Sequence, residues 1–350
     1  MINRRKSKEL CIGNVKIGGN APVSVQSMCN TDTRDINATA CQIKELAKAG
    51  CEIVRLAVLN SAAADAVKEL VKTSPVPLVA DIHFDYRLAI QCINNGIHAL
   101  RLNPGNIGKH ENTVKVVTLA KQRNIPVRIG VNAGSLEKEI EAENLPLHEK
   151  MVKSALKHIK ILEDLDFDLI KVSLKSSDVL TTIEAYRAIS GKIPYPLHLG
   201  VTEAGTLRGG LIKSSVGLGT LLAEGIGDTI RVSLTENPTE EVSAGFEILK
   251  SLGLRQKGVN FISCPTCGRT QIDLIRLAKQ VEEKFKNLDK PITIATMGCA
   301  VNGPGEAKHA DFGIAGGTGE GYVFKKGEII AKVPEEQLLG KLEEVINKYC

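Results

Sequence analysis

Short apolar runs alternate with stretches of helical spacing along the first 250 residues of this chain. The apolar runs cover residues 23–28, 53–58, 77–82, 99–102, 126–131, 169–174, 196–201 and 229–234. Apolar residues recur at helical intervals in the segments between them, such as 38–48, 62–71, 148–165 and 240–252. Strand–helix alternation repeated eight times predicts a (β/α)8 TIM barrel. The alternative is a doubly wound open sheet, which normally has a glycine-rich turn after its first strand, and none follows residues 23–28.

The pattern changes after residues 253–258, where a smaller second domain is predicted. Its segments are a strand at 259–263, an amphipathic helix at 272–285, a second strand at 292–296, a further segment at 311–314, a hairpin-like region that follows 316–321 and a closing helix at 334–348. The glycine-rich segment lacks the Gly-Lys-Ser/Thr ending of a phosphate-binding P-loop. We therefore expect a TIM barrel at residues 1–254, followed by a small α/β domain at residues 258–350.

Six of the predicted barrel strands carry a basic residue between apolar neighbours: Arg55, Arg101, Arg128, Lys171, His198 and Arg231. Because side chains alternate between the two faces of a strand, the apolar neighbours would pack against the helices and the basic side chains would converge inside the barrel. Burying several cations without partners is prohibitive. We therefore expect a polyanionic ligand at the C-terminal mouth, most simply one or two phosphates. Further hydrogen bonds can come from the strand-end residues Asn103, Asn132, Ser173 and Ser233.

Internal ion pairing is the alternative explanation for these basic residues. Asp81 and Glu203 follow barrel strands and are the acids best placed for it, but the six basic residues outnumber them. A carboxylate at the C-terminal end of a barrel strand is also well placed for proton transfer. We interpret Glu203 as a candidate general acid or base, with a structural salt bridge as the alternative.

Three cysteines in the last quarter of the chain predict an iron–sulfur site. Cys264 and Cys267 form a C-x-x-C pair, Cys299 follows a Met-Gly dipeptide, and the run Asn302-Gly-Pro-Gly-Glu306 comes next. A cubane cluster is normally held by four cysteine sulfurs, whereas here Glu306 offers a carboxylate as the fourth ligand. Such a ligand is weaker, so a substrate oxygen could replace it and the cluster could take part in the chemistry. The Gly-Pro-Gly turn favours this interpretation because such turns bring backbone close to an inorganic centre.

Three other interpretations of the cysteines stay open. A zinc ribbon would need a second close pair, and Cys299 has no C-x-x-C partner, since Cys350 lies at the extreme terminus. A redox dithiol of the thioredoxin type should sit at the start of a helix and would leave Cys299 without a role. The last interpretation is that the three thiols are unrelated and buried.

Composition narrows the class of protein further. Aromatic residues make up 3% of the chain and tryptophan is absent, so stacking on nucleic-acid bases is not expected. Nine cysteines in 350 residues are too few for a disulfide framework and are consistent with reduced thiols in a cytosol. The sequence shows neither the apolar stretch of a signal peptide nor a run as long as a membrane span. We therefore expect a cytoplasmic redox enzyme without a nucleic-acid or membrane partner.

Seven stretches, spread along the whole chain, match the sequence motifs of one known family. They are residues 23–28 (VSVQSM), 80–83 (ADIH), 102–106 (LNPGN), 128–132 (RIGVN), 200–205 (GVTEAG), 264–268 (CPTCG) and 301–306 (VNGPGE). With the barrel and the cysteines, they closely resemble the bacterial (E)-4-hydroxy-3-methylbut-2-enyl diphosphate synthase family. The resemblance implies a step of the methylerythritol phosphate (MEP) route to isoprenoids. In that step, 2-C-methyl-D-erythritol 2,4-cyclodiphosphate is reductively opened and dehydrated to the linear allylic diphosphate.

The resemblance also implies roles for individual residues. The ligands of a [4Fe–4S] cluster would be Cys264, Cys267, Cys299 and Glu306, and Glu306 would leave the fourth iron when a substrate oxygen binds. Glu203 would be the proton-transfer residue of the barrel. The diphosphate would be gripped by Arg55, Arg101, Arg128, Lys171, Arg231 and Ser233.

The family's partners follow from the same resemblance. Two electrons would come one at a time from ferredoxin or flavodoxin. The chain would form a homodimer in which the cluster domain of one subunit closes over the barrel of the other. Two alternatives remain: a pterin-binding-type barrel transferase with a zinc-stabilised appendage, and a non-catalytic iron–sulfur binding or sensing protein.

Overall fold

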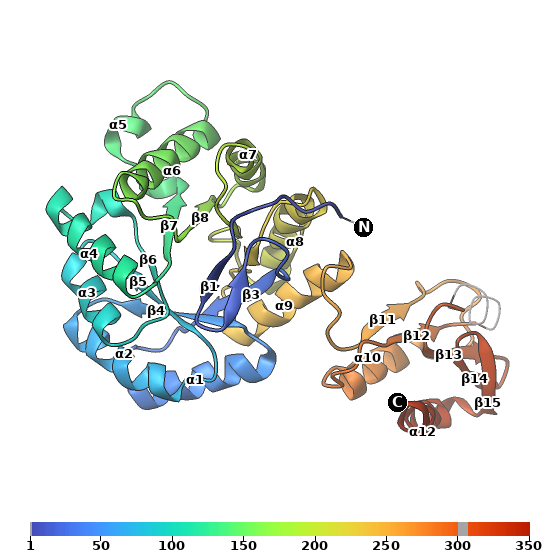
Figure 1. The fold of residues 1–350 in the computed structure, drawn as a ribbon. Helices are drawn as coiled ribbons and strands as arrows, with labels where there is room; N and C mark the ends of the chain where they lie inside the picture. Colours follow the sequence, from blue (N-terminus) through green and yellow to red (C-terminus); the bar gives the residue numbers. More distant parts are fainter. Residues whose placement is uncertain (1, 300–306) are drawn as a thin grey trace. The chain divides into compact units, whose positions relative to one another are not determined.

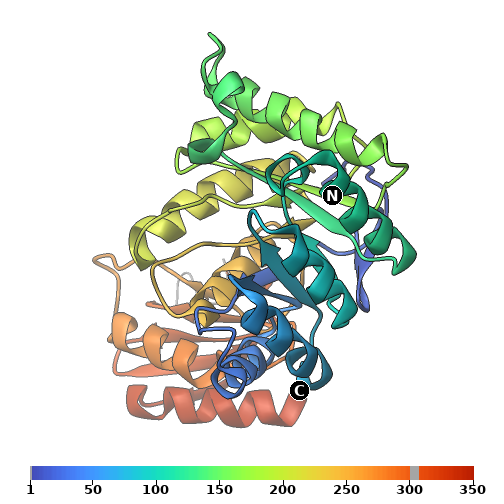
Figure 2. The same cartoon turned by 90° about the vertical axis from the view of Figure 1, so that its left-hand side faces the viewer.

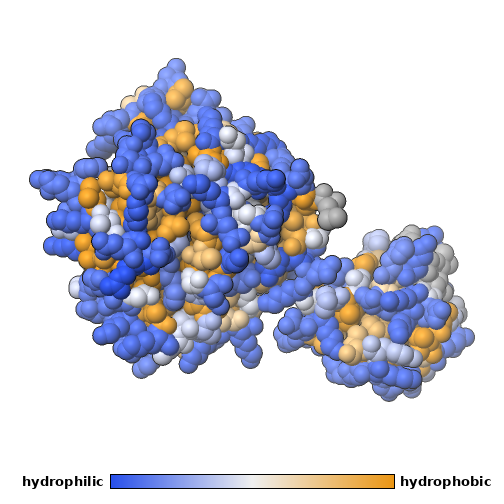
Figure 3. All heavy atoms as spheres, viewed as in Figure 1, coloured by the Kyte–Doolittle hydropathy of each residue, from blue (hydrophilic) through white to orange (hydrophobic). Residues whose placement is uncertain are grey.

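The computed structural model describes residues 2–299 and 307–350. The chain divides into two compact units, Met1–Arg255 and Gln256–Cys350 (Figure 1). Each unit has its own buried hydrophobic cluster. Hydrophilic residues cover most of the visible face of both units (Figure 3). None of the described helices is long and apolar enough to span a bilayer.

Eight parallel strands close into a barrel in the first unit (Figure 1, Figure 2). In chain order they are β3 (Ser24–Met28), β4 (Ile53–Val58), β5 (Leu78–Ile82), β6 (Ala99–Arg101), β7 (Val127–Asn132), β8 (Ile170–Lys175), β9 (His198–Leu199) and β10 (Thr229–Ile230). Their spatial order is β8-β7-β6-β5-β4-β3-β10-β9. An isolated parallel bridge between Val172 and Leu197 joins β8 to β9 and closes the ring. The predicted (β/α)8 barrel is confirmed, and the open sheet is excluded.

Helices follow the strands and cover the outside of the barrel (Figure 2). They are α1 (Ile36–Ala49), α2 (Ser61–Thr73), α3 (Tyr86–Asn94), α4 (His110–Gln122), α5 (Lys138–Glu141), α6 (Leu147–Glu163), α7 (Val179–Ser190), α8 (Leu207–Ala223) and α9 (Pro238–Ser251), with 3-10 turns η1 (Pro104–Asn106) and η2 (Ala133–Ser135). Several begin at a side-chain cap, because Asp35, Asn60 and Asp178 each accept a backbone N–H of the first turn. The four helices predicted from spacing are α1, α2, α6 and α9.

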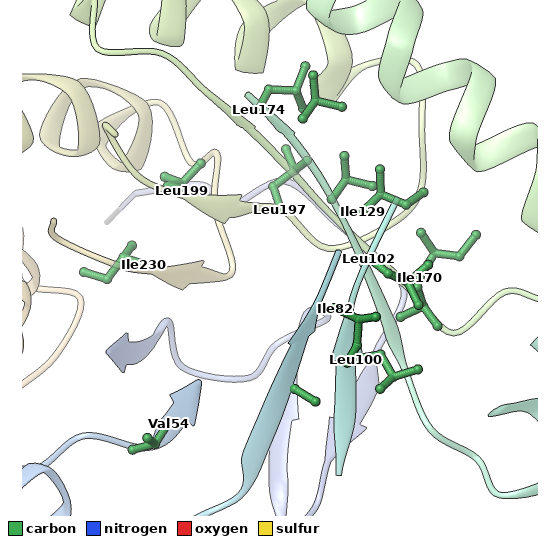
Figure 4. Close-up of a cluster of buried hydrophobic side chains, with 14 of the residues drawn as sticks. Val54, Ile82, Leu100, Leu102, Ile129, Ile170, Leu174, Leu197, Leu199 and Ile230 are labelled. Atoms are coloured by element: carbon green, nitrogen blue, oxygen red, sulfur yellow. The ribbon is translucent and has the colours of Figure 1, made fainter. Parts of the chain in front are cut away.

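Side chains of the barrel strands alternate as predicted. The apolar ones pack with the helices in one buried cluster, which contributes about 1.5–3 kcal/mol for each fully buried large side chain. Figure 4 labels Val54, Ile82, Leu100, Leu102, Ile129, Ile170, Leu174, Leu197, Leu199 and Ile230 from this cluster. The residues between them therefore face the barrel interior, and these include all the basic residues singled out in the sequence.

An antiparallel hairpin, β1 (Leu10–Ile12) and β2 (Val15–Ile17), precedes the barrel and was not predicted. It packs against the first residues of three barrel strands in a separate apolar cluster of Leu10, Ile12, Ile17, Ile53, Val79 and Ala99. The hairpin thus closes the N-terminal end of the barrel. Its strands have three residues each, which is too short for an alternating pattern to be recognised.

Two barrel strands are shorter than predicted. Strand β9 has two residues where 196–201 was expected. Its late start is consistent with Pro196, which has no N–H to give to a neighbouring strand. Strand β10 has two residues where 229–234 was expected. Beyond it, the N–H of Leu234 donates to the carboxylate of Glu241 at 3.1 Å instead of to a strand. The last residues of this segment therefore belong to the mouth of the barrel.

The second unit is a five-stranded sheet packed with helices. Its strands β11 (Asn260–Ser263), β12 (Thr293–Met297), β13 (Phe312–Gly317), β14 (Glu320–Lys325) and β15 (Glu328–Val333) pair in chain order, and the first three are parallel. The helical segments are α10 (Leu274–Phe285), η3 (Glu335–Gln337) and α12 (Leu338–Tyr349). The predicted small α/β domain is confirmed. Segment 316–321 contains the tight turn between β13 and β14, with Gly319 at φ +74°, and is not a phosphate loop.

Candidate functional site

A layer of basic side chains lines the barrel interior toward the C-terminal ends of the strands. It contains the six predicted residues and also Lys175, the last residue of β8. Arg101 lies opposite Arg128 in the strand register, and Arg128 lies opposite Lys171. The most buried members are Arg101, Arg128, Lys171, Lys175 and His198. Like charges placed opposite one another in a sheet repel, so this layer is unfavourable without an anion.

Two carboxylates neutralise part of this layer. Oδ1 of Asp81 lies 3.2 Å from Nη1 of Arg101, and its Oδ2 lies 3.6 Å from Nε of Arg55. Burial raises the pKa of Asp81, but Arg55 and the neighbouring basic groups outweigh it and hold that pKa well below its usual range. Glu241, from α9, accepts from Nε and Nη2 of Arg231 at 3.2 and 3.3 Å. Internal pairing therefore accounts for three of the cations.

The other basic residues have no acidic partner among the described residues. Arg128 donates from Nη1 to the Ser173 hydroxyl at 2.7 Å, while its Nε and Nη2 are buried without a hydrogen bond. The Lys171 Nζ, both ring nitrogens of His198 and the amide of Gln26 are also buried without a partner. Each such atom costs about 1–3 kcal/mol when left unsatisfied. Their concentration in one place indicates a ligand that supplies acceptor atoms.

Burial and mutual repulsion disfavour the charged forms of these bases. Burial, with Arg231 and Arg101 adding to it, lowers the pKa of Arg55 to about 10 despite Asp81. Burial and then the neighbouring cations lower the pKa of Arg128, Lys171, Lys175 and His198 well below their ordinary values. An anionic ligand at this layer would reverse the repulsive contribution.

Two glycines leave room for the cations. A Cβ at Gly130 would lie 2.5 Å from Nε of Arg101, and a Cβ at Gly200 would overlap Nζ of Lys175. Asn103 holds the same Gly130, because its amide donates to the Gly130 carbonyl at 3.0 Å and its oxygen accepts the Gly130 N–H at 2.9 Å. Asn103 therefore ties the segment that follows β6 to β7, while the half-buried Asn132 and Ser233 lie near the ends of β7 and β10.

Glu203 lies in the loop after β9 with a strained backbone. Its φ is +52°, a left-handed value that costs a residue other than glycine about 1 kcal/mol or more. Its side chain is exposed and forms no ion pair with any residue that the structure describes. The alternative of a structural salt bridge is therefore not supported, and the strained placement is typical of functional sites.

Two members of the site, Lys175 and Glu241, were missed in the sequence, whereas the stretch that begins at Gln26 was expected to line the mouth. The signal for Lys175 was present, because Lys171, Ser173 and Lys175 alternate along β8 and share its inner face. Gln26 alternates in the same way along β3. Glu241 had no such signal, since it comes from the first turn of a helix, where acidic residues are common.

The cysteine segments of the second unit leave its sheet side by side. Ser263 of β11 lies opposite Thr296 of β12 in a parallel pair, so Cys264 and Cys299 follow neighbouring strand ends. The N–H of Gly298 donates to Sγ of Cys264 at 3.1 Å. Two segments more than 30 residues apart in the chain thus meet at one edge of the sheet.

The chemistry of these thiols suits an iron–sulfur cluster. Hydrogen bonding from the Arg269 backbone is the main cause that lowers the pKa of the exposed Cys267, which favours the thiolate needed for metal binding. Cys264 accepts an N–H bond of the kind that tunes cluster sulfurs. The C-x-x-C pair does not open a helix as a thioredoxin dithiol does, because α10 begins only at Leu274.

The structure describes three of the four predicted cluster ligands. Within residues 2–299 and 307–350, no three His, Cys, Asp or Glu side chains are grouped closely enough to hold a metal ion. Glu306, the predicted fourth ligand, lies outside the described residues. Cys264 is half-buried, Cys267 is exposed and Cys299 is buried.

Comparison with solved structures identifies the barrel fold. Dihydropteroate synthase from Stenotrophomonas maltophilia is 11% identical, with a TM-score of 0.54 over 71% of this chain and 97% of that chain. N-acetylneuraminic acid synthetase from Leptospira borgpetersenii is 14% identical, with a TM-score of 0.51 over 72% of this chain and 92% of that chain. At such low identity, the likeness extends to the fold alone.

Comparison of sequences is more specific. Residues 7–246 match the GcpE TIM-barrel domain, and residues 260–348 match the GcpE protein C-terminal domain. A relative from Clostridium perfringens is 59% identical over 99% of both chains, and one from Geobacter sulfurreducens is 58% identical over 99% of this chain and 98% of its own. Both are named 4-hydroxy-3-methylbut-2-en-1-yl diphosphate synthase (flavodoxin). With both units matched and identity near 60% over almost the whole length, this chain belongs to the GcpE family.

Proposed function

We propose that this chain catalyses the reductive ring opening and dehydration of 2-C-methyl-D-erythritol 2,4-cyclodiphosphate in the MEP route to isoprenoids. The product is (E)-4-hydroxy-3-methylbut-2-enyl diphosphate. The observation that carries the proposal is the layer of buried bases with unsatisfied donors at the barrel mouth. Relatives 58–60% identical are named for this synthase activity. The pterin-transferase alternative is not favoured, because the likeness to dihydropteroate synthases is one of fold only.

The barrel, residues 1–254, is the proposed substrate-binding domain. Ser173 fixes Nη1 of Arg128 and leaves Nε and Nη2 free, so the guanidinium is oriented before a phosphate arrives. The Glu241 carboxylate, from α9, orients Arg231 by accepting from its Nε and Nη2. The full set of proposed substrate ligands is Arg55, Arg101, Asn103, Arg128, Asn132, Lys171, Ser173, His198, Arg231 and Ser233.

The excess of cations also suits the course of the reaction. Breaking the ring C–O bond with two electrons leaves a phosphate oxygen with a new negative charge, and the hydroxyl leaves as water after taking one proton. Fixed cations stabilise this additional charge more than they stabilise the substrate, which lowers the barrier. Glu203, exposed in the loop after β9, is the proposed proton donor to the departing hydroxyl.

Residues 258–350 form the proposed iron–sulfur domain. Cys264, Cys267, Cys299 and Glu306 would hold a [4Fe–4S] cluster, which when bound supplies the two electrons one at a time. The support lies in the adjacent cysteine segments and in the thiolate character of Cys267. Ferredoxin or flavodoxin is the proposed electron donor, in line with the flavodoxin in the relatives' name.

We further propose that the chain acts as a homodimer in which the iron–sulfur domain of one subunit closes over the barrel of the other. The proposed diphosphate ligands and the proposed cluster ligands lie in different units of the chain. Turnover therefore requires the two units to meet, either within one chain or between two. Closure would also exclude water from the reduced site.

Replacing Arg128 with Met should raise KM for the cyclic diphosphate about 10–150-fold, as expected for about 1.5–3 kcal/mol lost per charged hydrogen bond. Arg128→Lys keeps a positive charge but loses the planar fork of guanidinium donors, so we expect a KM between those of the wild type and Arg128→Met. Steady-state kinetics measures both, and the exposed Arg123→Met is the matched control. An unchanged KM in Arg128→Met would remove this residue from the substrate site.

Cys264→Ser, Cys267→Ser and Cys299→Ser should each lose iron, sulfide and brown absorbance when the protein is purified without oxygen. The wild type should hold about four irons and four sulfides per chain, and so should the control Cys41→Ser. Glu306→Ala should keep the cluster but lose turnover, or lose one iron. Zinc instead of iron in the wild type would overturn the redox proposal.

Glu203→Gln should lower kcat about 10²–10⁴-fold with little change in KM, because the amide keeps the shape but cannot donate a proton as an acid. Single-turnover and steady-state kinetics separate the two effects. Glu236→Gln removes another exposed acid, in the loop after β10, and should be silent. Equal kcat values for Glu203→Gln and the wild type would show that another group supplies the proton.

Mixing Arg128→Met with Cys267→Ser tests the closure between subunits, provided that activity is assayed well below the raised KM of Arg128→Met. Under that condition Arg128→Met has little activity and Cys267→Ser lacks a cluster, yet a mixed dimer would contain one intact site. After subunit exchange, activity should return to about one quarter of the wild-type value, since half of the dimers are mixed. Closure within a single chain predicts no recovery at any mixing ratio.

A further inference from the structure

Three bases that can lose a proton lie together on two neighbouring barrel strands. Lys171 and Lys175 are on the inner face of β8 with Ser173 between them, and His198 is on β9. The bridge between Val172 and Leu197 brings the two strands together at this level. Lys171 Nζ and both His198 nitrogens are buried without a hydrogen bond, and Lys175 reaches across to Gly200 at the end of β9. We name Lys171, Lys175 and His198 the basic triad.

The charged groups around the basic triad are mainly cations. Arg55, Arg101 and Arg128 lie on the inner face of β4, β6 and β7, and Arg231 comes directly after β10. Of these, Arg55 and Arg128 act on the triad electrostatically, and Arg231 acts on Lys175. Of the carboxylates, Asp81 is engaged by Arg55 and Arg101, and Glu241 is engaged by Arg231. Asp228 is bound by Arg4 at 3.3 Å and by the N–H of Leu197 at 2.8 Å. The Tyr186 hydroxyl donates to the carbonyl of His198 and accepts the N–H of Leu174.

Arginine and lysine respond differently to this environment. An arginine keeps its proton under almost all conditions, whereas a buried lysine or histidine can release one and become neutral. Burial and the neighbouring cations lower the pKa of all three triad residues well below ordinary values. The arrival of a diphosphate would add negative charge beside them, and the same groups would then favour their protonated forms.

We propose that the basic triad is uncharged in the empty barrel and takes up protons from solvent when the diphosphate binds. Each neutral base gains one proton from solvent and becomes a cation, and no electron is transferred. Repulsion in the empty barrel is relieved, and full positive charge is present only when an anion is there. The inference rests on the proposed function for the identity of the ligand, but proton uptake is measured separately from affinity.

The test is calorimetric titration of the intact protein with inorganic pyrophosphate and with the cyclic diphosphate, at one pH near 8 in buffers of different ionisation enthalpy. The slope of the binding enthalpy against the buffer enthalpy gives the protons taken up for each ligand bound. We expect the wild type to take up about one to three protons, since three bases are available.

Lys175→Arg is the decisive variant, because arginine stays charged in the empty barrel. It should bind pyrophosphate with an affinity within about tenfold of the wild type but take up fewer protons. Lys175→Met should lose both affinity and proton uptake, and His198→Gln should lose uptake. Lys68→Arg, an exposed lysine on α2, is the control and should match the wild type in both quantities.

The outcomes separate this inference from the proposed function. Normal binding of the cyclic diphosphate with no dependence on the buffer would overturn proton uptake while leaving the function standing. Equal uptake in Lys175→Arg and the wild type would exclude Lys175 as a proton acceptor. Pyrophosphate binding with proton uptake, but without binding of the cyclic diphosphate, would support the triad and count against the proposed substrate.

Discussion

Moving a cation from water into a protein interior costs several kcal/mol unless an anion accompanies it. This barrel places six lysines and arginines and a histidine in its inner layer against the carboxylates of Asp81 and Glu241. The imbalance is not relieved elsewhere in the described part of the layer, since Arg128, Lys171 and His198 keep unsatisfied atoms. The fold therefore carries a cost that a bound polyanion offsets, and this cost defines the site.

The rest of the barrel offsets this cost and orients the basic side chains. The outward faces of the strands contribute a continuous apolar cluster with the helices, which offsets the polar interior. Ser173 and Glu241 hold Arg128 and Arg231 in fixed orientations, so the donors are arranged before the ligand arrives. The missing side chain of Gly130 leaves space for Arg101. The barrel thus acts as a rigid frame around groups that repel one another.

The sequence predicted most of this arrangement because its signals are local. Alternation along single strands was sufficient to place Arg55, Arg128 and Lys171 inside the barrel, and helix spacing found α1, α2, α6 and α9. It could not show that Asp81 pairs with Arg55 and Arg101 or that Glu241 reaches Arg231 from a helix, because those contacts depend on how distant segments pack. The predicted length of β10 was wrong for the same reason, since the Glu241 carboxylate, from α9, accepts the N–H of Leu234.

The short β1–β2 hairpin affects how substrate and product enter and leave the barrel. By closing the N-terminal end with an apolar layer around Ile12 and Ile17, it leaves the C-terminal mouth as the end of the barrel where the proposed substrate binds. Substrate and product would both pass through that mouth, and the product leaves with one more negative charge than the substrate had on entry. A departing molecule that is held more tightly than the incoming one competes for the same bases.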